Sequence, residues 1–267
     1  MKICFISSLV ADDRSSTDKV GQFKKFGDHD FYLFTNLTSF KHDTWNVIYL
    51  DNNVLNTLTH IYDEDSDNLK QCMINNVYKS RYIKFMGWHY LKNVMNKKYD
   101  IIFYCDAIYS PNERMDWQGT AKKIKECESG LIQKFHPLKS NPYSEAMLCT
   151  RCKKHSKQNE EAIINYLKSV NAKQTRIYEN TTFGYDPNNE KITNAFYDFW
   201  NIHSTKKLTY RDQPLWGWMC QKHNIKAVNC PTIHTNIVHK ITPPNETWFF
   251  NYTGQNFNRS RTYDHLH

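Results

Sequence analysis

The chain has 267 residues, of which 40% are hydrophobic and 15% aromatic, and this composition excludes a disordered protein. Its formal net charge of +8 favours an anionic partner: a phosphorylated small molecule, a nucleic acid or an acidic membrane surface. The basic residues are dispersed in short pairs, without the dense stripe that long nucleic-acid contacts show. We therefore expect a small anionic substrate and no nucleic-acid partner.

The sequence contains no apolar run of the roughly 18 residues that a membrane span requires. Met1 leads directly into a short apolar segment that is too short for a signal peptide. Several of the eight cysteines lie inside apolar segments, which is typical of free thiols in a reducing compartment. These features predict a soluble, cytoplasmic protein.

The first part of the chain alternates apolar runs with polar loops. Residues 2–7, 30–35 and 45–50 form such runs and predict three early strands. Apolar residues recur at helical spacing from about 69 to 96, which predicts one long helix or two joined helices. The run 99–106 is apolar on both faces and predicts a buried strand. This alternation indicates an α/β sheet.

The second part continues the alternation of helices and strands. Its expected helices cover residues 114–128, 144–170 with a possible break near 151, 192–200 and 214–223. Its expected strands cover residues 131–136, 176–185 and 225–230. The polar residues after 242 predict an irregular C-terminal extension.

The clearest candidate for a reaction centre is Arg211-Asp212-Gln213, which stands before Pro214 at the expected start of a helix. Proline suits the first helical position, and a carboxylate there stays ionised in the positive end of the helix dipole. Asp212 is either a helix cap or a reacting group. Because an acid, a guanidinium and an amide in succession exceed what one cap requires, we take all three as candidate catalytic residues.

A second candidate is Asp106, which ends the expected buried strand. In open α/β sheets ligands bind beyond the carboxyl ends of the strands, so this acid either serves a ligand or caps the next turn. Arg81 and Lys84 lie three residues apart on the preceding helix and therefore share one face. They are candidates to hold a diphosphate, although such pairs are often solvated.

Three residues of the second half are candidates for substrate binding. His136 ends a strand and Glu145 begins a helix, where exposed and fixed acceptors can bind sugar hydroxyls. Glu145 is equally well explained as a helix-entry acid. Trp216 has two interpretations. Together with Trp200 and Trp218 it forms an aromatic wall for a sugar ring, or it belongs to the side of its helix that faces the core.

The spacing of Cys149, Cys152 and His155 is similar to that of metal ligands. All three lie inside one expected helix, where they cannot easily converge on a single ion. We therefore do not assign a metal site to them.

Five of these segments occur in the order and approximate spacing of a known family: residues 80–84, 103–107, 135–137, 143–146 and 210–213. The chain thereby resembles, over about residues 70 to 240, a GT-A-fold glycosyltransferase-like family that was once catalogued only as a domain of unknown function. Its plant members are linked to cell-wall or mucilage polysaccharide. The resemblance implies an α/β fold, with a GT-A-like, Rossmann-related mixed sheet flanked by helices in a single domain.

The resemblance also implies a division of the chain. Residues 1–242 would form the glycosyltransferase domain, with a nucleotide-sugar half at 1–110 and an acceptor half at 111–242, and residues 243–267 would form the extension. The implied enzyme transfers a sugar from a nucleotide-diphosphate donor to a hydroxyl of a glycan or glycoprotein, with Asp212 at the reaction centre and with inversion or retention left open. A microbial or viral enzyme in the cytoplasm, or in host cytoplasm if viral, suits this composition.

The family's Asp-x-Asp pair holds a divalent ion that bridges the donor's phosphates. Here the second acid is missing, because Asp106 is followed by Ala107 and Ile108. The resemblance implies Mn²⁺ or Mg²⁺ held by Asp106 with His234 or His239, both of which follow the last expected strand. The missing acid puts strict metal dependence in doubt.

Two other classes of protein stay open. A basic nucleic-acid-binding protein would explain the charge and the many aromatic residues. A catalytically inactive, carbohydrate-binding relative would explain the missing acid.

Overall fold

The structure, a computed structural model, describes residues 1–12, 19–59, 68–138, 140–234 and 248–252. Its centre is a mixed sheet with strands in the order β3-β2-β1-β4-β7-β6-β8. The strands are β1 (Ile3–Leu9), β2 (Asp30–Thr35), β3 (Asn46–Tyr49), β4 (Ile101–Cys105), β6 (Leu131–Phe135), β7 (Tyr178–Tyr185) and β8 (Val228–Asn229). Strands β1, β2, β3 and β4 pair with one another in parallel, β8 is parallel to β6, and β7 runs antiparallel to both β4 and β6.

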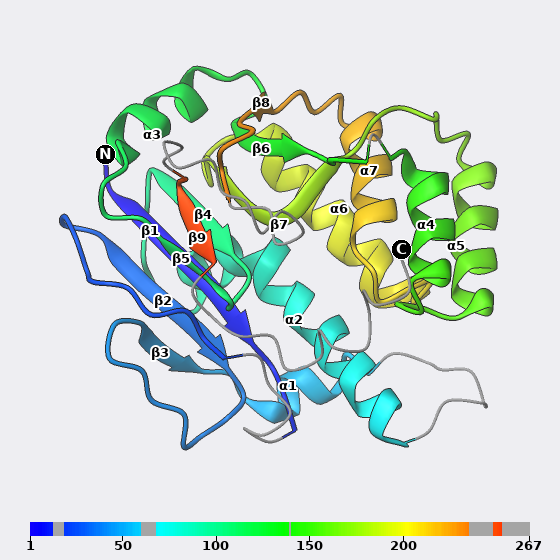
Figure 1. The fold of residues 1–267 in the computed structure, drawn as a ribbon, viewed down its shortest axis with the longest axis horizontal. Coiled ribbons are helices and arrows are strands. Elements are labelled where there is room, and N and C mark those ends of the chain that lie inside the picture. The colour runs from blue at the N-terminus through cyan, green and yellow to red at the C-terminus, as the bar shows by residue number, and fades with distance from the viewer. Residues whose placement is uncertain (13–18, 60–67, 139, 235–247, 253–267) are drawn as a thin grey trace.

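Helices cover both faces of this sheet (Figure 1). They are α1 (Asn52–Asn56), α2 (Asn68–Asn93), α3 (Trp117–Glu126), α4 (Pro142–Arg151), α5 (Lys157–Ser169), α6 (Glu190–Lys206) and α7 (Gln213–Lys222). A separate two-stranded sheet pairs β5 (Tyr109–Pro111) with β9 (Phe250–Tyr252). The predicted α/β class, a mixed sheet flanked by helices in one domain, is confirmed. No helix in the described parts of the chain is long and apolar enough to cross a membrane.

Alternate residues of the central strands feed two separate cores, because successive side chains of a strand point to opposite faces. Cys4 and Ile6 of β1 face the core that also contains residues of α2 and of α4 to α7. Ile3 and Phe5 face the other side, where α3 and β9 complete an aromatic cluster. The sheet is thus held rigidly from both sides.

Most expected elements are present with small shifts at their ends, and the long helix is one continuous α2. The expected break near residue 151 is also present: α4 ends at Arg151, Lys153 adopts a positive φ of 53°, and Ser156 caps α5 by accepting from the backbone N–H of Asn159. The short elements α1, β5 and β9 were not expected from the sequence. Strand β9 lies inside the segment expected to be irregular.

The connection between β3 and β4 determines where a ligand would bind. The chain moves outward from β1 to β2 and β3, then returns through α2 to place β4 on the other side of β1. Side chains at the carboxyl ends of β1 and β4 therefore border the crevice where the strand order reverses. Open α/β sheets bind their ligands at such a point.

Candidate functional site

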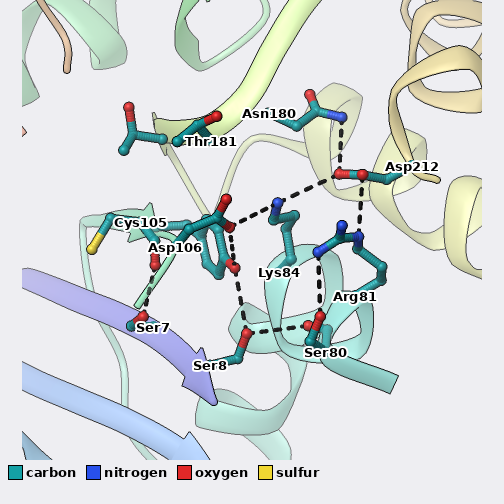
Figure 2. A network of polar contacts seen from close by, with 12 residues as sticks. Ser7, Ser8, Ser80, Arg81, Lys84, Cys105, Asp106, Asn180, Thr181 and Asp212 are labelled. Atoms are coloured by element: carbon teal, nitrogen blue, oxygen red, sulfur yellow. Dashed lines mark hydrogen bonds and ion pairs between the residues drawn. The ribbon is translucent and has the colours of Figure 1, made fainter. Parts of the chain in front are cut away.

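The side chain of Lys84 joins the two acids that the sequence singled out (Figure 2). Its Nζ atom lies 3.0 Å from Asp106 Oδ1 and 3.5 Å from Asp212 Oδ2. Asp106 directly follows β4, Asp212 directly precedes α7, and Lys84 comes from the middle of α2. Three segments far apart in the sequence thus meet at one ammonium group, which is only 2% exposed.

Asp212 is held by groups from three directions. Arg81 Nε lies 3.1 Å from its Oδ1 atom, and Asn180 on β7 donates an amide hydrogen bond of 3.2 Å to its Oδ2 atom, the atom that also faces Lys84. The carboxylate makes no capping bond to α7, although Asp212 occupies the cap position. Its side chain therefore serves this polar cluster and not the helix end.

The protonation state of Asp212 follows from these contacts. Burial alone would raise the pKa of its carboxyl group, but the positive charges of Arg81, Lys84 and Arg211 outweigh burial and hold the pKa well below its ordinary value. Asp212 is therefore a permanent carboxylate near neutral pH. A carboxylate with so low a pKa is a weak base.

Asp106 is the accessible member of the cluster, with a side chain that is 34% exposed. Its backbone N–H donates to the carbonyl of Thr181 at 3.0 Å, and its Oδ1 atom accepts a hydrogen bond of 2.9 Å from the Tyr104 hydroxyl. Burial raises the pKa of Tyr104 well above its usual value, so this hydroxyl remains a donor. Ser8 at the end of β1 contacts the same hydroxyl at 3.3 Å.

A chain of two amides fixes the orientation of Asn180. The Trp216 indole donates to Gln133 Oε1 at 3.2 Å, and Gln133 Nε2 donates to Asn180 Oδ1 at 2.8 Å, which directs the Asn180 amide toward Asp212. Sequence analysis missed both amides. Gln133 and Asn180 are 1% and 2% exposed. The available signal for Gln133 was a polar residue after the apolar start of β6, whereas Asn180 stands within a run of polar residues on β7 and gave no such signal.

Trp216 itself is 1% exposed and packs against Phe85 and Phe196. The structure thus places it in the core, as one of the two sequence-based interpretations proposed. It supports the site through Gln133 and does not line a surface for a sugar ring.

A second polar group contains Glu179, which is next to Asn180 on β7. His136 Nε2 is 3.6 Å from Glu145 Oε2, and His234 Nε2 is 3.2 Å from Glu179 Oε2. Burial would raise the pKa of Glu179, but the hydrogen bond and charge of His234 prevail and lower it to about 2. Burial lowers the pKa of His136. The structure therefore brings His136 and Glu145 together and adds Glu179, but it buries His136 and Glu145, at 9% and 6% exposed, where the sequence predicted exposed acceptors.

Of the remaining expected residues, Arg211 acts on Asp212 through its charge. The Nε atom of Arg211 and the Nε2 atom of Gln213 are buried and have no hydrogen-bond partner among the described residues. Their catalytic role stays a prediction.

The residues expected to hold a metal do not form the expected shell. Both ring nitrogens of His234 face protein groups, Nδ1 at 2.7 Å from Thr182 Oγ1 and Nε2 at 3.2 Å from Glu179 Oε2. His239 lies outside the described residues. Within the described part of the chain no group of three or more His, Cys, Asp or Glu side chains is arranged to hold a metal ion. On Asp106, the position facing Asp212 is taken by Lys84.

A cavity of about 760 Å³ opens beyond the carboxyl ends of β1 and β2. Its lining includes Asp12, Lys19, Asn36, Phe40 and His42. The Asn36 amide fixes the loop after β1, since it donates to the carbonyl of Ala11 at 2.7 Å and accepts from the Ala11 N–H at 3.0 Å. The volume is within the usual range for small-molecule sites.

The chain matches no family model and no curated protein sequence. Among solved structures it is similar to the apo form of mouse xyloside xylosyltransferase 1, with 8% sequence identity and a TM-score of 0.47 over 94% of this chain and 97% of that chain. A likeness at this level carries no information on activity, so function must be argued from the geometry of the site.

Proposed function

We propose that the protein is a glycosyltransferase that moves a sugar from a nucleotide-diphosphate donor to a hydroxyl of a glycan or glycoprotein. The observation that carries this proposal is the shared contact of Lys84 with Asp106 and Asp212 at the point where the strand order reverses. Three of the segments on which the family resemblance rests, residues 80–84, 103–107 and 210–213, supply this one cluster. Their order in the sequence alone did not require that they meet.

The cavity and the cluster lie along the same helix, which supports one elongated donor site. Asn76 on α2 donates to Asp12 Oδ2 at 3.2 Å, and Asp12 lines the cavity. One helical turn later, the carbonyl of Ser80 accepts from Ser8 at 3.3 Å, next to Arg81. In the proposed arrangement the nucleoside occupies the cavity, and the diphosphate reaches the cations of the cluster.

The low pKa of Asp212 favours one of the two roles considered for it. A permanent carboxylate suits the stabilisation of positive charge at the anomeric carbon better than proton removal. The bond from the anomeric carbon to the diphosphate oxygen breaks, and its electron pair stays on that oxygen. The acceptor hydroxyl forms the new bond and passes its proton to the departing diphosphate. This transfer requires attack on the face that the diphosphate leaves, so we propose retention of configuration.

A panel of UDP- and GDP-sugars tests the proposal through donor-induced shifts of the melting temperature and release of the nucleoside diphosphate. We expect one donor to raise the melting temperature, and NMR of the product to show the anomeric configuration of the donor. Asp212→Asn should lower turnover by about a hundredfold or more, the usual cost of removing one electrostatic group from a reaction centre.

The control is Asp198→Asn, because Asp198 also contacts two basic groups, Lys222 and His223, but on the outer side of α6 and α7. Turnover of the Asp212 variant at the level of this control would remove Asp212 from the mechanism. Donor binding without release of nucleoside diphosphate would identify a catalytically inactive relative. Salt-sensitive binding of random oligonucleotides without any nucleotide-sugar effect would favour the nucleic-acid-binding alternative.

A further inference from the structure

We infer that Lys84 supplies the positive charge that a divalent ion would otherwise bring to the donor's diphosphate, so that donor binding does not require a metal. This inference rests on the proposed function and concerns the same site. Its starting point is the position of the Lys84 ammonium, which lies between Asp106 and Asp212, the two acids where a bridging cation would be sought.

The charges in direct contact at this point already balance. Arg81 and Lys84 bring two positive charges, and Asp106 and Asp212 bring two negative charges. Arg211 adds a further positive charge close enough to lower the pKa of Asp212. A divalent cation would leave a large excess of buried positive charge, which is costly. Without a metal ion, a diphosphate would bind at a site where the three cations exceed the two carboxylates by one positive charge.

The oxygen ligands available at this site also argue against a bound divalent ion. A hard divalent cation needs several oxygen ligands, usually more than one of them from carboxylates. The residues directly after Asp106 are Ala107 and Ile108, both buried and both without a donor side chain. The Oδ1 atom of Asp106 already faces the Lys84 ammonium and the Tyr104 hydroxyl. An ammonium group has taken the place of the ion in this donor set.

Accessibility identifies which contact the phosphate replaces. Asp212 is 3% exposed and held by Arg81 and Asn180, so it keeps its contact with Lys84. Asp106 is the exposed partner of Lys84. A phosphate oxygen that enters from solvent therefore displaces the Asp106 carboxylate from Lys84. As the bond from the anomeric carbon to oxygen breaks, the electron pair that remains on the diphosphate is stabilised by Lys84 and Arg81.

Isothermal titration of the full chain with UDP and with GDP, in EDTA and in Mn²⁺, tests the inference. We expect one of them to bind in EDTA, with an affinity that Mn²⁺ changes less than about threefold, a difference of well under 1 kcal/mol. Lys84→Met should weaken that binding by about tenfold to a hundredfold, the usual effect of losing a charged hydrogen bond. Lys84→Arg should restore part of it. Lys125→Met is the matched control, because it removes an ion pair of 2.7 Å with Asp186 on the opposite face of the sheet.

The variant Asp106→Asn best distinguishes binding that depends on a divalent metal ion from binding that depends on the Lys84 ammonium. A metal ligand cannot be lost without loss of metal-assisted binding, whereas removal of a carboxylate that competes for Lys84 should leave nucleotide binding at least as tight as in the wild type. Electron paramagnetic resonance of Mn²⁺ with the unmodified protein needs no variant to fold, and we expect no tight binding of the ion.

The outcomes distinguish this inference from the proposed function. Nucleotide binding that appears only with Mn²⁺, or that is lost in Asp106→Asn, overturns the role of Lys84 and leaves the transferase proposal standing. Absence of binding by UDP, GDP and the nucleotide sugars, with and without Mn²⁺, overturns both. Metal-independent binding that is weakened in Lys84→Met but not in Lys125→Met supports both.

Discussion

At the scale of single residues, the cluster around Asp212 is a candidate site and also affects the stability of the fold. Arg81 and Lys84 are 9% and 2% exposed, and both contact the Asp212 carboxylate, while Lys84 also contacts Asp106. Buried charges that lose their partner are strongly destabilising, whereas exposed ion pairs contribute little. This chain contains an acid of each kind, the buried Asp212 and the partly exposed Asp198, so their contributions to stability can be compared directly.

We predict that Asp212→Asn lowers the free energy of unfolding by about 3 kcal/mol or more, because the buried Arg81 loses its counter-charge and the buried Lys84 loses one of its two carboxylate partners. Asp198→Asn should cost less than about 1 kcal/mol, since Asp198 is 34% exposed although it too contacts two basic groups. Urea unfolding of both variants measures the difference. Equal losses of unfolding free energy in the two variants would show that the buried charges around Asp212 contribute no more to stability than an exposed ion pair does.

The sequence identified the charged members of the site better than its neutral ones. Asp106 and Asp212 stand at element ends, where local patterns are informative, and they meet as the proposed reaction requires. Asn180 and Gln133 lie within strands, so nothing in their immediate neighbours shows what they face. Whether Trp216 lined a pocket or the core depended on tertiary packing, which periodicity alone does not determine.

At the scale of elements, His155 ties the α4–α5 corner to the turn that precedes α7. Its Nε2 atom bonds the carbonyl of Ala146 at 2.8 Å, and its Nδ1 atom bonds Thr209 Oγ1 at 2.9 Å. The same Thr209 oxygen accepts from the Arg211 N–H at 3.1 Å. His155 was considered as a metal ligand on its spacing, but both nitrogens are used to position the segment that carries Asp212.

This arrangement predicts a loss of stability in mild acid. Burial lowers the pKa of His155 from 6.5 to about 4, so the unfolded chain takes up a proton at a higher pH than the native protein does. The unfolding free energy is therefore unaffected by His155 above pH 6.5 and falls as the pH drops from 6.5 to 4, by up to about 3 kcal/mol.

Melting temperatures across this pH range measure the effect. His155→Gln, which can still donate to the Ala146 carbonyl, should be less stable than the wild type at pH 7 but should show a shallower decline with acid. Parallel declines in the two proteins would assign the pH dependence to other groups, such as His136.

At the scale of the whole molecule, the second core is closed by strand β9. Phe250 on β9 is fully buried, and its ring centre lies 5.2 Å from that of Trp117 and 6.3 Å from that of Phe5. The sequence after residue 242 is polar and rich in Asn, so it predicts no element there. The strand forms because β5 offers an edge and the aromatic cluster offers burial, and neither is visible in the local sequence.

We predict that Phe250→Ala lowers the free energy of unfolding by about 3 to 5 kcal/mol, because it leaves a large cavity in an aromatic core. Tyr197→Ala on α6 is the control, since this ring is 57% exposed and should contribute little. Chemical denaturation of the two variants is the measurement. A loss in Phe250→Ala as small as in the control would mean that β9 does not close the core.

The way in which Lys84 links Asp106 to Asp212 has a consequence for the newly made chain. During synthesis, β1 to β4 and α2 leave the ribosome well before α7, so Lys84 and Asp106 exist for a time without Asp212. No fragment that stops short of residue 212 can assemble the whole cluster. The proposed activity would therefore appear only after α7 has been translated, and a chain cut short before residue 212 would lack it.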